Sequence, residues 1–214
     1  MDLAQRLVAF ERADLYVVIT ESFCAGRTAL EVLARVLEAG VGIVQLREKD
    51  LFGCEMYELA GKFRRLTSAA GALLIIDDRV DIALAAGADG VHLGQNDLPV
   101  AAARRIASDL LIGASSHSLE EALAAQEAGA SYVNIGPIFP TATKPQAVSL
   151  GVEAISHIAP HLKIPWSTMG GINQSNIAQV VPRGARHPAV MSAVTAAPDV
   201  RAAARALREA ILSH

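Results

Sequence analysis

The feature that most constrains this 214-residue chain is a recurring junction, in which a helix-like segment ends at a glycine and an apolar stretch follows at once. The four junctions read EAGVGIVQL, AAGADGVHLG, EAGASYVNIG and PRGARHPAVMS, with their glycines at Gly40, Gly87, Gly129 and Gly184. Glycine at this place is typical of a helix that ends in the left-handed conformation before a strand. The repeat therefore predicts helices and strands in alternation.

Between these junctions the sequence supplies eight candidate strands, separated by helical segments. They span residues 15–20, 42–47, 73–77, 90–93, 110–115, 132–136, 163–169 and 189–192. Strands that alternate with helices pair in parallel through right-handed crossovers, and eight such units favour a closed (βα)8 TIM barrel. The alternative is an open doubly wound sheet, which is disfavoured because no GxGxxG motif follows the first strand.

The chain shows no linker and no break in composition, so we expect residues 1–214 to form a single TIM-barrel domain. Residues 1–14 form an amphipathic, charged segment that we interpret as a short N-terminal helical extension. A helix from Ser118 is expected to carry a capping box with Glu121. The connection over residues 137–150 is long for a compact domain, and such loops are usually functional.

The charge and composition limit the kinds of partner and compartment. The formal net charge of −3 gives no overall basic field for nucleic acid, and no apolar run of 18 residues predicts a membrane span. Two cysteines, Cys24 and Cys54, match no zinc pattern and are typical of free thiols in a reducing compartment. We expect a cytoplasmic protein without nucleic-acid or membrane partners; the sequence does not decide the number of chains, and a homodimer stays open.

Polar residues gather where the predicted strands end. In GIVQLREKD, the alternating residues Gln45, Arg47 and Lys49 point to one side of a strand. Each such group of polar residues, taken alone, can have a purely structural role, such as a solvated strand end or a helix cap. All of them fall on the carboxyl rim, however, where TIM barrels place their active sites. The other rim residues are Asp77, Asp78, Asp97, Ser115, His117, Thr141, Thr143, Lys144, Gly170, Gly171, Met191 and Ser192.

The rim residues divide into two chemistries. Arg47, Lys49 and Lys144 are cations suited to a diphosphate. Asp78 and Asp97 are hard carboxylates without nearby His or Cys, which favours Mg²⁺. The loops after strands seven and eight commonly bind one phosphate, and Gly170-Gly171 and Met191-Ser192 stand there. The pattern predicts two phosphorylated substrates, one a diphosphate with metal and the other a monophosphate.

Several motifs in the same order resemble the thiamine-phosphate synthase (thiamine phosphate pyrophosphorylase) family over nearly the whole chain. They are VQLREKD, DDRVDIALAAGADGVHLGQNDLP, HSLEEA, GPIFPTATK and GGI. The resemblance implies a Mg²⁺-dependent transferase that joins hydroxymethylpyrimidine diphosphate to thiazole phosphate, with release of diphosphate. It implies a dissociative reaction, in which diphosphate leaves before the thiazole nitrogen attacks.

The resemblance also implies a role for each matching position. Arg47, Lys49, Ser115 and Lys144 are the expected catalytic residues, and Asp78 and Asp97 the expected metal ligands. The pyrimidine diphosphate is expected to contact Gln45, Leu46, Arg47, Glu48, Lys49, Asp77, Ser115 and Lys144. The thiazole phosphate is expected to contact Thr141, Ala142, Thr143, Gly171, Met191 and Ser192.

Some positions depart from the family pattern. Asp77 stands where the family usually has Asn, and a carboxylate there is expected to repel diphosphate unless a cation offsets it. In the last two strands Trp166, Met169, His187 and Pro188 are unusual, and we expect these changes to lie near the thiazole-phosphate end. Pro188 is tolerable only as the first residue of its strand.

Two other readings stay open from the sequence. One is a thiazole tautomerase-like barrel, which has no need of a cation row or of two metal carboxylates. The other is a degenerate barrel that only binds thiamine precursors, for which the departures in the last two strands are the main support.

Overall fold

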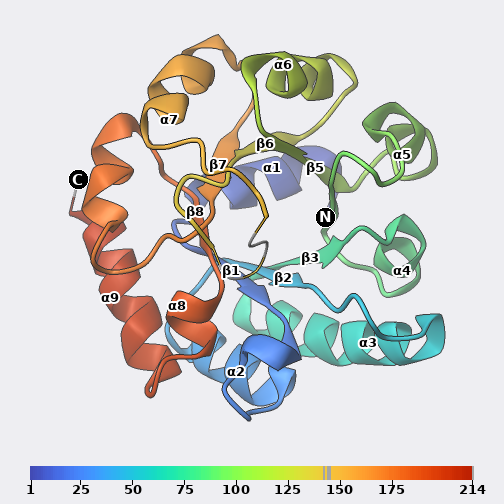
Figure 1. Cartoon of the computed structure of the whole chain (residues 1–214). Coiled ribbons are helices and arrows are strands. Elements are labelled where there is room, and N and C mark those ends of the chain that lie inside the picture. The colour runs from blue at the N-terminus through green and yellow to red at the C-terminus, as the bar shows by residue number, and fades with distance from the viewer. Residues whose placement is uncertain (142, 144–145, 214) are drawn as a thin grey trace.

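The structure, a computed structural model, describes residues 1–141, 143 and 146–213 and is a closed barrel of eight parallel strands in sequence order (Figure 1). The predicted (βα)8 barrel is confirmed. Each strand is short and almost wholly buried, as parallel strands covered on both faces are expected to be. The strands are β1 Tyr16–Ile19, β2 Ile43–Leu46, β3 Leu73–Asp77, β4 Gly90–Leu93, β5 Leu111–Ser116, β6 Tyr132–Ile135, β7 Trp166–Met169 and β8 Pro188–Val190.

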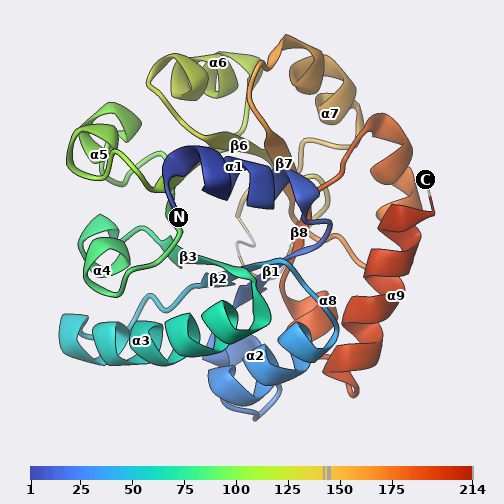
Figure 2. The same ribbon diagram turned by 180° about the vertical axis from the view of Figure 1, so that it is seen from behind.

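Helices surround the barrel as an outer ring, with one further helix at its floor (Figures 1 and 2). They are α1 Leu3–Arg12, α2 Ala29–Glu38, α3 Gly53–Ala70, α4 Val80–Ala85, α5 Val100–Ile106, α6 Leu119–Glu127, α7 Glu153–Ile158, α8 Ser192–Thr195 and α9 Val200–Leu212. Between β7 and β8 the chain makes two 3₁₀ turns, Ile177–Gln179 and Val181–Arg183, in place of an α-helix. Pro182 lies in the second turn and lacks the N–H that a continuing helix needs. No helix among the described residues is long and apolar enough to cross a membrane.

The junction glycines behave as the sequence predicts. Gly40 and Gly184, for example, have φ of 79° and 90°, the left-handed conformation that ends a helix. Of the two hydrogen bonds predicted for the capping box of α6, only one is present. Ser118 Oγ accepts from the backbone N–H of Glu121 at 3.1 Å, but the Glu121 carboxylate accepts from the N–H of His117 instead of that of Ser118.

Side-chain alternation divides the core in two. Outward-facing strand residues such as Val17, Val44 and Leu74 pack with the helices. Inward-facing residues fill the barrel floor, where the Phe10 ring of α1 stacks on Tyr132 with ring centroids 4.5 Å apart. Figure 2 shows α1 lying across this amino end. The floor is closed by apolar side chains, so the polar inward positions are left at the carboxyl rim.

A buried carboxylate ties α1 and α3 to the floor of the barrel. Asp89 is 2% exposed, pairs with Arg64, and lies 3.6 Å from the Nε of Arg6. Its Oδ2 also accepts from the backbone N–H of Leu74 at 2.9 Å. Breaking a buried pair from one side leaves a desolvated charge, so this residue is expected to matter greatly for stability.

We expect Asp89→Ala to lower the free energy of unfolding by about 3–5 kcal/mol, because it leaves the Arg6 and Arg64 guanidinium groups without their buried partner. Urea unfolding followed by circular dichroism measures this loss. The matched control is Asp81→Ala, which removes an exposed carboxylate paired with Arg79 and is expected to cost less than about 0.5 kcal/mol. A loss below about 1 kcal/mol for Asp89→Ala would contradict this assignment.

Candidate active site

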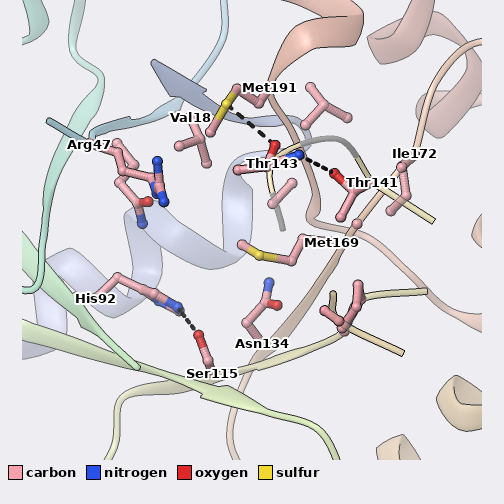
Figure 3. A pocket seen from close by; sticks show the side chains of 18 of the residues that line it. Val18, Arg47, His92, Ser115, Asn134, Thr141, Thr143, Met169, Ile172 and Met191 are labelled. Carbon is pink, nitrogen blue, oxygen red and sulfur yellow. Dashed lines mark hydrogen bonds between the residues drawn. The ribbon is translucent and has the colours of Figure 1, made fainter. Parts of the chain in front are cut away.

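One pocket of about 470 Å³ opens at the carboxyl ends of the strands (Figure 3). It is the place where a (βα)8 barrel carries its active site, because the loops that follow the strands converge there. Most of the site residues predicted from the sequence line it. Those that do are Gln45, Arg47, Lys49, Asp77, Asp78, Asp97, Ser115, Thr141, Thr143, Gly171, Met191 and Ser192.

Two predicted residues at and just after the end of β2 do not place their side chains in the pocket lining. Leu46 is fully buried in the core between barrel and helices, and the Glu48 carboxylate accepts from the N–H of Glu21 at 2.7 Å. Strand alternation is the reason, since both lie between the inward-facing residues. Contact of these two with substrate stays a prediction. Ala142 and Lys144, also predicted from the sequence, lie outside the described residues.

The cations that follow β2 meet the carboxylate that ends β3. Lys49 Nζ lies 2.9 Å from Asp77 Oδ2 and also pairs with Asp78, while Arg47 Nε lies 3.5 Å from Asp77 Oδ2. Burial raises the pKa of Asp77, although Lys49 and Arg47 oppose the shift. Burial acts to lower the pKa of Lys49, but the Asp77 and Asp78 carboxylates outweigh it and raise the value. Both cations are thus held in place before any anion arrives.

Asp78 has φ of 60°, an uncommon conformation for a residue other than glycine. Its N–H donates to the His92 carbonyl at 2.8 Å, which fixes this turn against β4. The side chain does not cap the helix that follows, because Arg79 occupies the N-cap position of α4. Strained backbone that persists at a rim is typical of a functional site. Here the turn brings the Asp78 carboxylate to Lys49.

Asp97 approaches the same point from the loop after β4. Its Oδ2 accepts from the N–H of Gly94 at 2.7 Å, and Pro99 is the N-cap residue of the following helix, α5. Burial raises the pKa of Asp97, and the neighbouring Asp78 carboxylate raises it further. Two carboxylates brought close together form a place where a cation is favoured. The loop and the turn together therefore bring two hard oxygen donors to one side of the pocket.

This pair fits Mg²⁺ better than a soft or tightly caged metal. Among the described residues no group of three or more His, Cys, Asp or Glu side chains converges as a metal site. Mg²⁺ is commonly held by one or two carboxylates, with water and substrate phosphate filling the remaining positions. Asp78 and Asp97 supply that number and kind of ligand.

The other side of the pocket comes from β6, β7, β8 and the loop after β6. Thr143 Oγ1 lies 3.9 Å from the Met191 sulfur, and its N–H donates to Thr141 Oγ1 at 3.3 Å (Figure 3). Gly170 and Gly171 have positive φ, and a Cβ at Gly170 would come within 2.5 Å of the Pro137 backbone. These glycines therefore let the β6 loop pack on the end of β7.

The unusual residues of the last two strands are mostly far from this pocket. Trp166 and Pro188 begin β7 and β8, and His187 Nδ1 donates to the Ala13 carbonyl at the amino end, 2.8 Å away. The expectation that they lie near the thiazole-phosphate end is therefore wrong, because strand direction places them at the opposite rim. Only Met169, the last residue of β7, lines the pocket. Pro188 occupies the first strand position, as required.

Sequence reasoning missed Asn134, an inward residue of the pocket. Asn134 is buried on β6, lines the pocket and donates through Nδ2 to Ser167 Oγ at 2.7 Å. His92 of β4 also lines the pocket and is hydrogen-bonded to Ser115 of β5 (Figure 3). Side-chain alternation along the strand could have identified Asn134, because Asn134 lies on the same face of the strand as Tyr132, two residues before it.

A closed barrel whose carboxyl rim brings cations, paired carboxylates and a glycine-rich loop around one pocket is a (βα)8-barrel enzyme of phosphorylated substrates. The family model for thiamine monophosphate synthase matches residues 15–194. The chain belongs to that family and is an enzyme of the transferase class, so the resemblance seen in its motifs is confirmed.

Individual relatives are similar in sequence to this chain over most of their length. The thiamine-phosphate synthase of Chloroflexus aurantiacus is 49% identical over 195 residues, covering 91% of this chain and 90% of that protein. The thiamine-phosphate synthase of Moorella thermoacetica is 46% identical over 200 residues, covering 92% and 95%. The solved structure of thiamine phosphate pyrophosphorylase from Pyrococcus furiosus superposes with a TM-score of 0.89 at 40% identity, covering 98% of both chains.

Proposed function

We propose that this chain is a thiamine-phosphate synthase that joins hydroxymethylpyrimidine diphosphate to thiazole phosphate, giving thiamine phosphate and diphosphate. The observation that carries the proposal is the division of a single pocket. Arg47, Lys49 and the Asp78–Asp97 pair occupy the side built by β2, β3 and β4. Gly171 and Ser192 occupy the side built by β7 and β8. A diphosphate and a monophosphate can thus be held at opposite walls.

The reaction balances without a proton transfer. The bond between the pyrimidine methylene carbon and the diphosphate oxygen breaks, and its electron pair leaves with the diphosphate. The methylene carbon becomes cation-like, and the lone pair of the thiazole nitrogen then forms the new carbon–nitrogen bond. Arg47, Lys49 and Ser115 line the pocket. We assign the two cations the role of neutralising charge on the departing oxygen, and Ser115 that of donating a hydrogen bond to it. Lys144 is proposed for the same role from its motif.

Asp78 and Asp97 are proposed to hold Mg²⁺, which supplies positive charge against the leaving diphosphate. The charges of the described rim groups favour a bound divalent cation. Asp77, Asp78 and Asp97 are three carboxylates that face only two cations among the described residues, Arg47 and Lys49. A diphosphate entering this side meets an excess of negative charge unless a divalent cation accompanies it.

The two alternative functions do not need all the charged groups that line the pocket. A tautomerase-like barrel handles only the monophosphate, and a barrel that merely binds precursors needs no leaving-group site. Neither explains why Asp78 is held at positive φ beside Lys49 and Asp97. The paired carboxylates and the cation row therefore favour the synthase.

The test is an assay with both phosphorylated precursors and Mg²⁺, in which diphosphate and thiamine phosphate are measured together. We expect both products in equal amounts, and neither when one precursor is omitted or when EDTA is added. Conversion of the thiazole phosphate alone would support the tautomerase-like reading. Absence of diphosphate at any Mg²⁺ concentration would overturn the synthase assignment.

Asp77→Asn tests the departure from the family pattern at the end of β3. The Asp77 carboxylate is 9% exposed and competes with diphosphate for Lys49 and Arg47. Its replacement by a neutral amide is expected to leave the KM for the pyrimidine diphosphate unchanged or to lower it a few-fold. Steady-state kinetics at saturating thiazole phosphate measure this. A KM that rises more than about tenfold would show that the carboxylate is needed for binding.

A further inference from the structure

Five side chains link the β2 and β5 parts of the pocket wall through the barrel interior. Gln45 Nε2 donates to the Tyr16 hydroxyl at 2.7 Å, and the Tyr16 and Tyr132 hydroxyls lie 3.0 Å apart. The Tyr132 hydroxyl lies 3.1 Å from His92 Nδ1, and His92 Nε2 lies 2.9 Å from Ser115 Oγ. The chain of hydrogen bonds begins and ends at residues that line the pocket, on β2 and β5.

The donor at one end sets the direction of every bond in the chain. Because Gln45 donates to Tyr16, the Tyr16 hydrogen is free to go to Tyr132, and the Tyr132 hydrogen to His92 Nδ1. A neutral His92 whose Nδ1 accepts carries its hydrogen on Nε2, which donates to Ser115. At the two ends, the Gln45 carbonyl oxygen and the Ser115 hydrogen have no other partner among the residues that the structure describes, so both are available to a ligand.

The middle of the chain is sealed from water. Tyr16 and Tyr132 are both fully buried, and burial raises the pKa of each, so each hydroxyl keeps one hydrogen to give. Gly113 of β5 makes room for the contact, since a Cβ there would lie 2.6 Å from His92 Nδ1 and closer still to the Tyr132 ring. In a buried chain no water can reverse one bond by itself, so the bonds reverse together or not at all.

We infer that Tyr16, Tyr132 and His92 are positioning residues, which make Gln45 a hydrogen-bond acceptor and Ser115 a hydrogen-bond donor toward the substrate. This rests on the proposed function and deepens it, because it sets the polarity of the pyrimidine diphosphate site. A ligand suited to this site gives an N–H to the β2 wall and takes a hydrogen bond from the β5 wall. A pyrimidine with an amino substituent has such an N–H, and its ring nitrogens and diphosphate oxygens are acceptors.

The first test is the tautomer of His92 in the free protein, read from its imidazole nitrogen-15 chemical shifts in solution alkaline enough to keep imidazoles neutral. The wild type is expected to carry the hydrogen on Nε2. Gln45→Met removes the donor that sets the direction, and the ratio of the two His92 tautomers is expected to shift toward the Nδ1–H form by about fivefold. An unchanged ratio would overturn the inference, because Ser115 alone would then fix His92.

Tyr16→Phe removes the next hydroxyl of the same hydrogen-bond series, and Tyr16 does not line the pocket. It is expected to shift the tautomer ratio as far as Gln45→Met does, and the double variant no further than either. Thr168→Val is the matched control, because it removes a buried hydroxyl of β7 that bonds the Ile135 carbonyl, outside the chain. A tautomer shift in Thr168→Val as large as in Tyr16→Phe would indicate a general disturbance of the barrel and overturn the inference.

Kinetics separate this inference from the proposed function. Tyr16→Phe is expected to raise the KM for the pyrimidine diphosphate about fivefold and to leave the KM for thiazole phosphate unchanged. Equal rises in both KM values would contradict a positioning role on one side of the pocket. The tautomer measurement needs no turnover, so a protein without synthase activity can still show the directional chain, and an active synthase can fail to show it.

Discussion

Asp97→Asn is expected to lower the rate of diphosphate release by about a hundredfold to a thousandfold at a fixed Mg²⁺ concentration, while the barrel stays folded. The amide can still accept the hydrogen bond from the Gly94 N–H, so the loop keeps its anchor. What it loses is the negative charge that pairs with Asp78 to hold the cation. Relief of the repulsion between Asp97 and Asp78 is also expected to leave stability unchanged or slightly higher.

The measurement is the initial rate of diphosphate release as a function of Mg²⁺ concentration. If Asp97 is a metal ligand, the half-saturating Mg²⁺ concentration rises in Asp97→Asn, and more Mg²⁺ recovers part of the rate. Asp50→Asn is the control, since Asp50 is an exposed carboxylate close to the cation row and does not line the pocket. A near-normal rate and an unchanged Mg²⁺ dependence for Asp97→Asn would show that the metal lies elsewhere.

Lys49→Met is expected to lower kcat/KM for the pyrimidine diphosphate by about a hundredfold. Lys49 Nζ pairs with both Asp77 and Asp78, so its loss leaves Asp78 without this partner and Asp77 with Arg47 alone, on the side of the pocket where the leaving group is expected to lie. Methionine keeps the length and apolar stem of lysine, which limits the change to the charge. The effect on kcat is expected to exceed that on KM, because charge on the leaving oxygen grows in the transition state.

Lys62→Met is the matched control for this variant. Lys62 is exposed on α3 and does not line the pocket, so the same substitution there removes an equal charge from the protein without touching the site. Its kinetic constants are expected to match the wild type. If Lys49→Met keeps kcat/KM within about threefold of Lys62→Met, Lys49 has no part in neutralising the leaving group.

Much of the fold follows from local sequence signals. The junction glycines and the apolar runs predict the eight strands because both reflect backbone geometry and burial, which short windows of sequence report directly. The link between β7 and β8 was not predicted as 3₁₀ turns, although Pro182 was a visible signal. The Ser118–Glu121 box was half wrong because the Glu121 carboxylate binds a neighbouring N–H that the spacing rule does not consider.

The part of the site that follows from side-chain alternation along a strand was predictable from the sequence. Alternation on β2 separates Gln45, Arg47 and Lys49 from Leu46 and Glu48, and the structure places only the first three in the lining. Contacts between strands distant in sequence could not be predicted. The pairing of Lys49 with Asp77, and the path from Gln45 to Ser115, depend on register across the closed barrel, which no local pattern specifies.

The central claim is that one pocket has a diphosphate side and a monophosphate side. A crystal structure of the protein with Mg²⁺ and inorganic diphosphate tests it most directly. We expect the diphosphate to lie against Arg47 and Lys49, with Mg²⁺ bound by Asp78 and Asp97. Diphosphate bound instead at Gly171 and Ser192, with no metal at the two carboxylates, would contradict the assignment of both sides.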